Sequence, residues 1–151
     1  IFMGIDPGSK SGAYAAINEK GEGWVTPWGD YSFIIAMKGL TILRDRDGEE
    51  LMAAVEKVGA MPKQGVSSTW SFGKNAGYIE GVLSALDIPF QLVPPRKWKS
   101  EFSLTSDKAK SIEVCHRLFP KINLKRTDRS HVDDNNLAEA LLISEYARRK
   151  L

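Results

Sequence analysis

Alternating blocks of apolar and polar residues predict a mixed α/β chain. Short apolar runs that end at Gly, Pro or charged residues are typical of buried strands. Five such runs cover Phe2–Asp6, Ala13–Ile17, Trp24–Trp28, Leu51–Val58 and Phe90–Val93. A tight Gly/Ser turn joins the first two runs and predicts a hairpin, which the third extends into a meander. With 151 residues the chain has the usual size of one domain, so we expect a single domain over residues 1–151.

Apolar residues at helical spacing fill most of the remaining chain. They predict helices over Tyr31–Leu43, over Ser71–Leu86, from the Ser106-Asp107 cap through Leu118, and from Asp133-Asp134 through Ala147, with a helical turn at Arg96–Lys99. Between them we expect a charged loop at Arg44–Glu50, a long segment over Gly59–Asn75 and a polar, basic loop over Lys121–Arg129. Long loops are uncommon in compact domains and often functional.

Three glycines share one face of the predicted Ser71–Leu86 helix, because Gly73, Gly77 and Gly81 are spaced four apart. Each costs the helix roughly 1 kcal/mol relative to Ala. The cost is explained if this face packs closely against another backbone. We favour the sheet as that neighbour over a nucleic-acid backbone.

Charge is uneven along the chain although the net charge is only +2. Residues 1–95 carry 8 Lys/Arg and 11 Asp/Glu, whereas residues 96–151 carry 13 and 8. A basic half suggests an anionic partner that binds from one side. The single cysteine, Cys115, falls in a helical pattern and is read as a core residue; it fits a reducing compartment. We expect a cytoplasmic or organellar protein that is not secreted and does not span a membrane.

Isolated carboxylates close two of the predicted core strands, Asp6 the first and Glu56 the fourth. A buried charge is costly unless it is paired or holds a cation, although Asp6 can also simply cap its turn. Glu139 lies in an apolar stretch of the last helix, four residues after Asn135. Oxygen ligands from scattered elements suit Mg²⁺ or Mn²⁺. Two such ions about 4 Å apart can cleave a phosphodiester.

Three segments in this order resemble the RuvC-type Holliday junction resolvases: Gly4–Gly8, Ala54–Val58 and Ala138–Leu142. The resemblance covers nearly the whole chain. It is greatest to the phage-borne and organellar branch, through Gln64-Gly65, Trp70–Gly73 and Pro95–Lys99. It implies a ribonuclease H-like fold with a mixed sheet and helices on both faces. It also implies a homodimer and Mg²⁺-dependent nicking of four-way DNA junctions with two ions per site, in which Mn²⁺ can substitute.

The resemblance assigns roles to residues. Asp6, Glu56 and Glu139 match the metal ligands, and the segment from Lys63 to Asn75 matches the part that enters the junction centre, with Trp70 or Phe72 as candidate wedges. Residues of two further segments are expected to contact the DNA backbone. The full expected DNA-binding set is Lys63, Gln64, Trp70, Ser71, Phe72, Lys74, Asn75, Arg96, Lys97, Lys99, Lys125, Arg126 and Arg129.

One departure concerns the last ligand. The family places an Asp or His three or four residues before the final acid, where this chain has Asn136 and Asn135. An amide is a weak neutral ligand, so Asn135 would leave a disabled catalytic site unless Asp134 serves instead.

Three other functions remain open. The asparagines are compatible with a non-catalytic junction binder of the same fold, and an RNA-processing nuclease would have the same acids. The acid–Gly turn after Asp6 also occurs in sugar kinases and actin-like ATPases, but the chain is too short for their two lobes, so we expect no nucleotide cofactor. Trp98 is read either as a base-stacking residue among cations or as a core residue.

Overall fold

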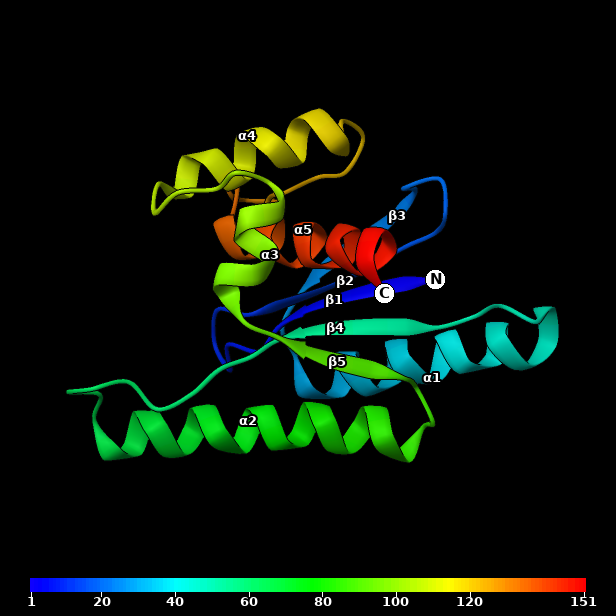
Figure 1. Cartoon of the computed structure of the whole chain (residues 1–151), viewed down its shortest axis with the longest axis horizontal. Coiled ribbons are helices and arrows are strands. Elements are labelled where there is room, and N and C mark those ends of the chain that lie inside the picture. The colour runs from blue at the N-terminus through cyan, green and yellow to red at the C-terminus, as the bar shows by residue number, and fades with distance from the viewer.

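Five strands form one mixed sheet in the computed structural model, which describes residues 1–151 (Figure 1). The strands are β1 (Phe2–Asp6), β2 (Ala13–Ile17), β3 (Gly23–Pro27), β4 (Met52–Glu56) and β5 (Phe90–Val93). The helices are α1 (Asp30–Asp47), α2 (Val66–Ala85), α3 (Pro95–Glu101), α4 (Lys108–Leu118) and α5 (Asn135–Lys150). The predicted class, a five-stranded mixed sheet with helices on both faces, is confirmed.

Strand order in the sheet is β3-β2-β1-β4-β5, so β1 lies at its centre. The pairs β1–β2 and β2–β3 are antiparallel, whereas β4 runs parallel to both β1 and β5. The register pairs Ile5 of β1 with Val55 of β4. The next residue of each strand is an acid, so Asp6 and Glu56 end neighbouring strands at the same edge.

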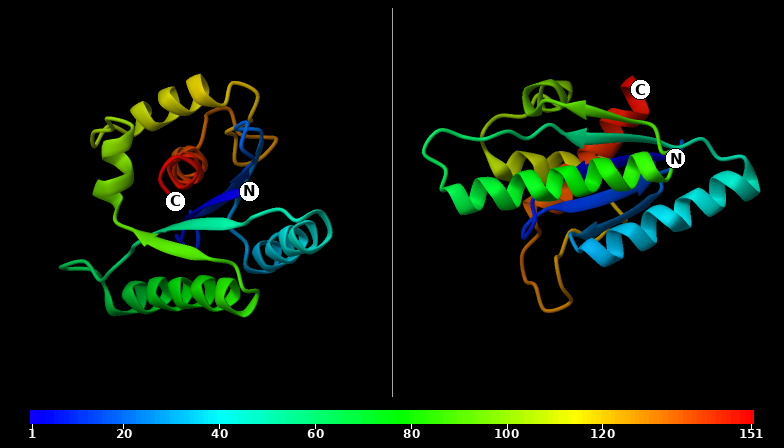
Figure 2. Two further views of the ribbon diagram at one scale, coloured as in Figure 1. Left: turned by 45° about the vertical axis from the view of Figure 1, so that its right-hand side comes forward. Right: turned by 90° about the horizontal axis from the view of Figure 1, so that it is seen from below.

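Helices cover the two faces of the sheet unequally. One face packs against α1 and α2, and the other against α5, which α4 covers from outside (Figures 1 and 2). Because α5 lies between the sheet and other helices, nearly every residue from Leu137 to Ala147 is buried. The C-terminal helix is therefore part of the core and not a surface element.

Alternation along β1 sends its side chains to opposite faces. Met3 and Ile5 join the cluster formed with α1 and α2. Gly4 faces α5, and a Cβ placed there would overlap the carbonyl oxygen of Ala140 and the amide nitrogen of Ser144. Gly4 therefore lets the backbone of α5 approach β1 closely. Asp6, two residues on, faces the same side of the sheet.

Two predicted helix boundaries were wrong. Helix α1 continues to Asp47 and ends at Gly48, which has a left-handed φ of 72°, so most of the expected Arg44–Glu50 loop is helical. Its last turn is held because Arg44 donates hydrogen bonds to the carbonyl oxygens of Leu86 and Asp87. Helix α2 begins at Val66 instead of Ser71, which shortens the expected Gly59–Asn75 segment. Its first turns are exposed and, apart from Val66 and Trp70, polar, so the apolar spacing typical of a buried helix face is missing there.

The glycine face of α2 does not pack on the sheet, which corrects our expectation. A Cβ added at Gly73, Gly77 or Gly81 would meet no atom within 4 Å. The residues of α2 that face the sheet are Asn75, Ile79, Val82 and Leu83. The glycines therefore lie on an open surface of the molecule.

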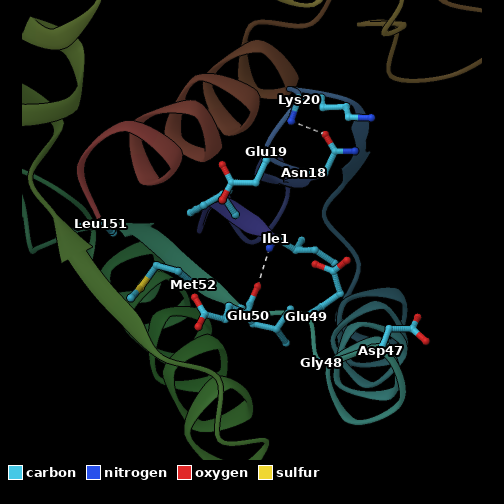
Figure 3. Close-up of a pocket in the computed structure, with 12 residues that line it drawn as sticks. Ile1, Asn18, Glu19, Lys20, Asp47, Gly48, Glu49, Glu50, Met52 and Leu151 are labelled. Atoms are coloured by element: carbon cyan, nitrogen blue, oxygen red, sulfur yellow. Dashed lines mark hydrogen bonds between the residues drawn. The ribbon is translucent and has the colours of Figure 1, made fainter.

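A hollow of about 500 Å³ lies where β1 begins, at the opposite end from Asp6 (Figure 3). Residues around Ile1, Glu19 and the loop before β4 line it, and the Ile1 amino group donates a hydrogen bond to the carbonyl oxygen of Glu50 (2.5 Å). Its distance from the strand-end acids separates it from the predicted chemistry. None of the helices has the length and apolar character required to cross a membrane.

Candidate active site

The three predicted acids gather at the edge of the sheet where β1 and β4 end. Asp6 and Glu56 come from the two parallel strands, and Glu139 lies on α5 directly before Ala140, the residue against Gly4. Asp6 is only 9% exposed. Burial, followed by the negative charges of Glu56 and Glu139, raises the pKa of Asp6 to about 7. The sequence thus places mutually repelling acids in one poorly hydrated site.

Helix α3 supplies partners for two of these acids. Trp98 is fully buried, and its indole Nε1–H donates to Glu56 Oε1 at 3.0 Å. Trp98 is therefore a core residue, which decides between our two interpretations of it. Burial raises the pKa of Glu56, an effect that the Trp98 hydrogen bond opposes. The next residue, Lys99, pairs with Glu139 (Nζ–Oε1 3.2 Å).

Asp134 and Asn135 stand at the start of α5. Asp134 is the N-cap: its Oδ1 accepts from the backbone N–H groups of Asn136 and Leu137. Its Oδ2 pairs with Arg126 Nε at 2.6 Å. Burial raises the pKa of Asp134, but these hydrogen bonds outweigh it and leave the pKa below its ordinary value. Both oxygens of Asp134 are thus already engaged within the chain.

Asn135 differs from its neighbour because its side-chain oxygen Oδ1 is buried and has no hydrogen-bond partner. An unpartnered buried carbonyl is costly. It lies four residues before Glu139, one turn away on α5. A hard cation between Asn135 and the acids would satisfy this oxygen.

The donor set fits a divalent cation in its chemistry. Three carboxylates and one orphaned amide oxygen are the hard ligands that Mg²⁺ and Mn²⁺ prefer. The side chains do not form a closed cage, since no group of three or more His, Cys, Asp or Glu residues is already disposed to hold a metal. The Lys99–Glu139 ion pair explains why the cage is not closed, because it pairs one of the three acids with a cation of the chain itself.

Most residues of the expected DNA-binding set lie around this edge. The turn after β4, the start of α3 and the loop before α5 all adjoin it (Figure 1). Trp70 is 74% exposed. The other exposed members are Lys63, Ser71, Lys74, Arg96, Lys97, Lys125 and Arg129, while Gln64, Phe72, Lys99 and Arg126 are half-buried.

Asn75 is the exception, because it is buried and its Nδ2 donates to the backbone oxygen of Pro7 at 2.6 Å. No pattern in the sequence predicted this contact or the hydrogen bond from Trp98 to Glu56. Each joins residues far apart in the chain. Only the polar character of Asn75 amid the sheet-facing residues of α2 could have pointed to an internal partner. Cys115 is buried as predicted, and burial together with Asp133 raises the pKa of its thiol to about 12.

Comparison with known proteins gave no matching protein-family model and no matching curated protein. Several solved structures are similar in fold, including the following three. The Thermus thermophilus RuvC complex with Holliday junction substrate has a TM-score of 0.58 at 16% identity, covering 98% of this chain and 95% of that one. A second Thermus thermophilus RuvC structure has a TM-score of 0.52 at 17% identity, covering 94% of this chain and 89% of that one.

The third is the yeast mitochondrial Holliday junction resolvase Ydc2, with a TM-score of 0.50 at 17% identity, covering 97% of this chain and 77% of that one. These matches extend over almost the entire chain, as the resemblance of the three acid-bearing segments predicted. The chain therefore has the ribonuclease H-like fold of the RuvC-type Holliday junction resolvases.

Proposed function

We propose that this chain is a structure-selective endodeoxyribonuclease that resolves four-way DNA junctions and depends on two Mg²⁺ ions, or Mn²⁺, per site. One observation carries the proposal: Asp6, Glu56 and Glu139 meet in a poorly hydrated site at the same edge as the exposed cations. The structure of Thermus thermophilus RuvC with a junction supports branched DNA as the substrate class.

Each part of the site has a role in this proposal. Asp6, Glu56, Glu139 and the Asn135 oxygen would hold the metal, which when bound supplies a reactive water and neutralises charge on the phosphate. Trp98 orients the Glu56 carboxylate by its hydrogen bond. The exposed cations would bind the DNA backbone, which positions the substrate without reading sequence.

A second function, junction binding without cleavage, is favoured by Asn135. A neutral amide cannot replace the charge of a carboxylate beside a dication. In this alternative the acids and the exposed cations remain a DNA-binding surface with little or no catalysis.

A binding competition with a labelled four-way DNA junction tests whether the chain, as a nuclease or as a non-catalytic binder, prefers junction DNA to RNA. In EDTA, the dissociation constant for the junction should be at least about tenfold lower than for duplex of the same length, a difference of about 1.4 kcal/mol. Raising the salt concentration should weaken both, because phosphate contacts release counterions. Unlabelled structured RNA should compete poorly. If RNA displaces the junction at equal concentration, the chain is better described as an RNA-processing nuclease.

We also propose that the chain acts as a homodimer through the open face of α2. Val66 and Trp70 are strongly exposed there, and the side of Gly73, Gly77 and Gly81 is free of contacts. Such small residues let another backbone approach closely. A four-way junction has paired cleavage positions, which two copies of one site would match.

Replacing Gly77 by Leu should convert the dimer to a monomer in light scattering. A Cβ added at Gly77 meets nothing within 4 Å inside the chain, so we expect the fold itself to tolerate the substitution. Gly39→Leu in α1 is the matched control, because that glycine also faces open space. A dimer that survives Gly77→Leu would exclude this face as the interface.

A further inference from the structure

The turn between β1 and β2 holds Asp6 in place and is itself tightly built. The Gly12 amide donates to the Gly8 carbonyl oxygen at 2.8 Å, and the Gly8 amide approaches Asp6 Oδ1 at 3.4 Å. A Cβ at Gly12 would overlap the backbone oxygens of Gly8 and Asp6. A shift of this turn would therefore move the Asp6 carboxylate with it.

Asn75 holds the turn from the side of α2. Its buried amide Nδ2 donates to the Pro7 oxygen at 2.6 Å, directly after Asp6 in the chain. Pro7 and Asn75 are separated by 68 residues, so the bond joins the turn to a different element. The residue before Asn75, Lys74, is exposed.

Arg126 holds the turn from the other side. Its Nη2 donates to the Ser11 oxygen at 2.6 Å, while Nε and Nη2 pair with the two oxygens of Asp134 at 2.6 and 3.2 Å. Since Asp134 caps α5, one guanidinium joins the turn to the helix start that precedes Asn135. A planar fork with several donors can make both contacts, whereas a lysine ammonium is a single point charge.

We propose that Asn75 and Arg126 are positioning residues, which fix the Pro7–Gly12 turn against α2 and the start of α5 and thereby set Asp6 relative to Asn135 and Glu139. The inference rests on the proposed metal-binding function of those three residues. It gives Asn75 and Arg126 a role inside the site instead of the DNA contacts expected from sequence. The remaining cations of the Lys121–Arg129 loop keep their expected role.

Mn²⁺ titration followed by electron paramagnetic resonance tests the proposal without requiring cleavage. Asn75→Leu and Arg126→Lys should each raise the Mn²⁺ dissociation constant by about tenfold or more, the usual effect of losing a group that orients a ligand. Amide hydrogen exchange in a peptide spanning residues 7–14 should become faster in both. Junction affinity in EDTA should change by less than about twofold, because the proposed role is not DNA contact.

Matched substitutions at exposed neighbours are the controls. Lys74→Leu introduces the same leucine one residue before Asn75, and Arg129→Lys makes the same arginine-to-lysine change three residues after Arg126. Both controls should leave the Mn²⁺ affinity and the amide exchange of the turn as in the parent chain. Far-UV circular dichroism checks folding; if Asn75→Leu does not fold, Asn75→Gln keeps the amide but changes its reach. If Arg126→Lys cannot be distinguished from Arg129→Lys in Mn²⁺ affinity, Arg126 does not position the site and the inference is overturned.

Failure of the proposed function would look different. If the parent chain binds no Mn²⁺, the metal site is wrong, and turn exchange alone decides the inference. Faster amide exchange in both variants would then support the inference that Asn75 and Arg126 fix the turn. Unchanged exchange would overturn that inference.

Discussion

Replacing Asn135 by Asp should raise Mg²⁺-dependent nicking of a labelled four-way junction by about 100-fold or more. The buried Oδ1 of Asn135 has no partner, so an aspartate oxygen would occupy the same place and add a negative charge. A well-held metal ion stabilises the transition state by several kcal/mol, and each 1.4 kcal/mol corresponds to about tenfold in rate. The measurement compares both chains on the junction, with plain duplex as a second substrate.

Asn136→Asp is the matched control, because it adds the same charge one residue along α5, where the backbone amide already bonds to Asp134. It should not activate cleavage. Equal cleavage by the parent chain and the Asn135→Asp form would mean that Asn136 or Asp134 completes the site. Binding by both forms without cleavage by either would favour the non-catalytic function.

Replacing Asp6 by Asn should stabilise the metal-free protein, most strongly above pH 7. The folded-state pKa of Asp6 is about 7 against an ordinary value of 3.8. Because the pKa of Asp6 is raised in the folded state, the protonated carboxyl adds to the free energy of unfolding. This contribution is complete below pH 3.8 and is lost as the pH rises through about 7. At about 1.4 kcal/mol per pKa unit the loss is on the order of 4 kcal/mol. Asn is neutral at every pH and keeps the acceptor for the Gly8 amide.

Urea unfolding from about pH 4 to about pH 8.5 in EDTA measures this effect. The difference between parent and Asp6→Asn should grow with pH, while Asp128→Asn, at an exposed acid, should give a flat difference. Saturating Mn²⁺ should stabilise the parent chain but not the Asp6→Asn form. A pH-independent difference would show that burial and the charges of Glu56 and Glu139 do not raise the pKa of Asp6.

Much of this site could be predicted because strands impose simple geometry. Alternation along β1 and the parallel register with β4 bring Asp6 and Glu56 together once both are recognised as strand ends. Glu139 stood out as a lone acid in an apolar run. These are local signals, and the fold they implied was confirmed.

Other features depend on partners far away in the chain and leave no local pattern. The close approach of Gly4 to Ala140, the hydrogen bond from Asn75 to Pro7 and the bond from Trp98 to Glu56 each require the finished tertiary structure. The glycine face of α2 was misassigned for the same reason. Spacing shows that three glycines share a face, but it does not show which face of the helix meets the sheet.

The position of α5 has a consequence for folding during synthesis. The face of the sheet built by β1, β2 and β4 is covered by α5 (Asn135–Lys150), which follows all five strands in the chain and is made long after β1. That apolar face therefore has no cover until α5 has left the ribosome, and its native contacts have very long sequence separation. Contacts of this kind slow folding and leave apolar surface exposed to aggregation in the interval. Removing α5 would leave the nascent chain in that exposed form.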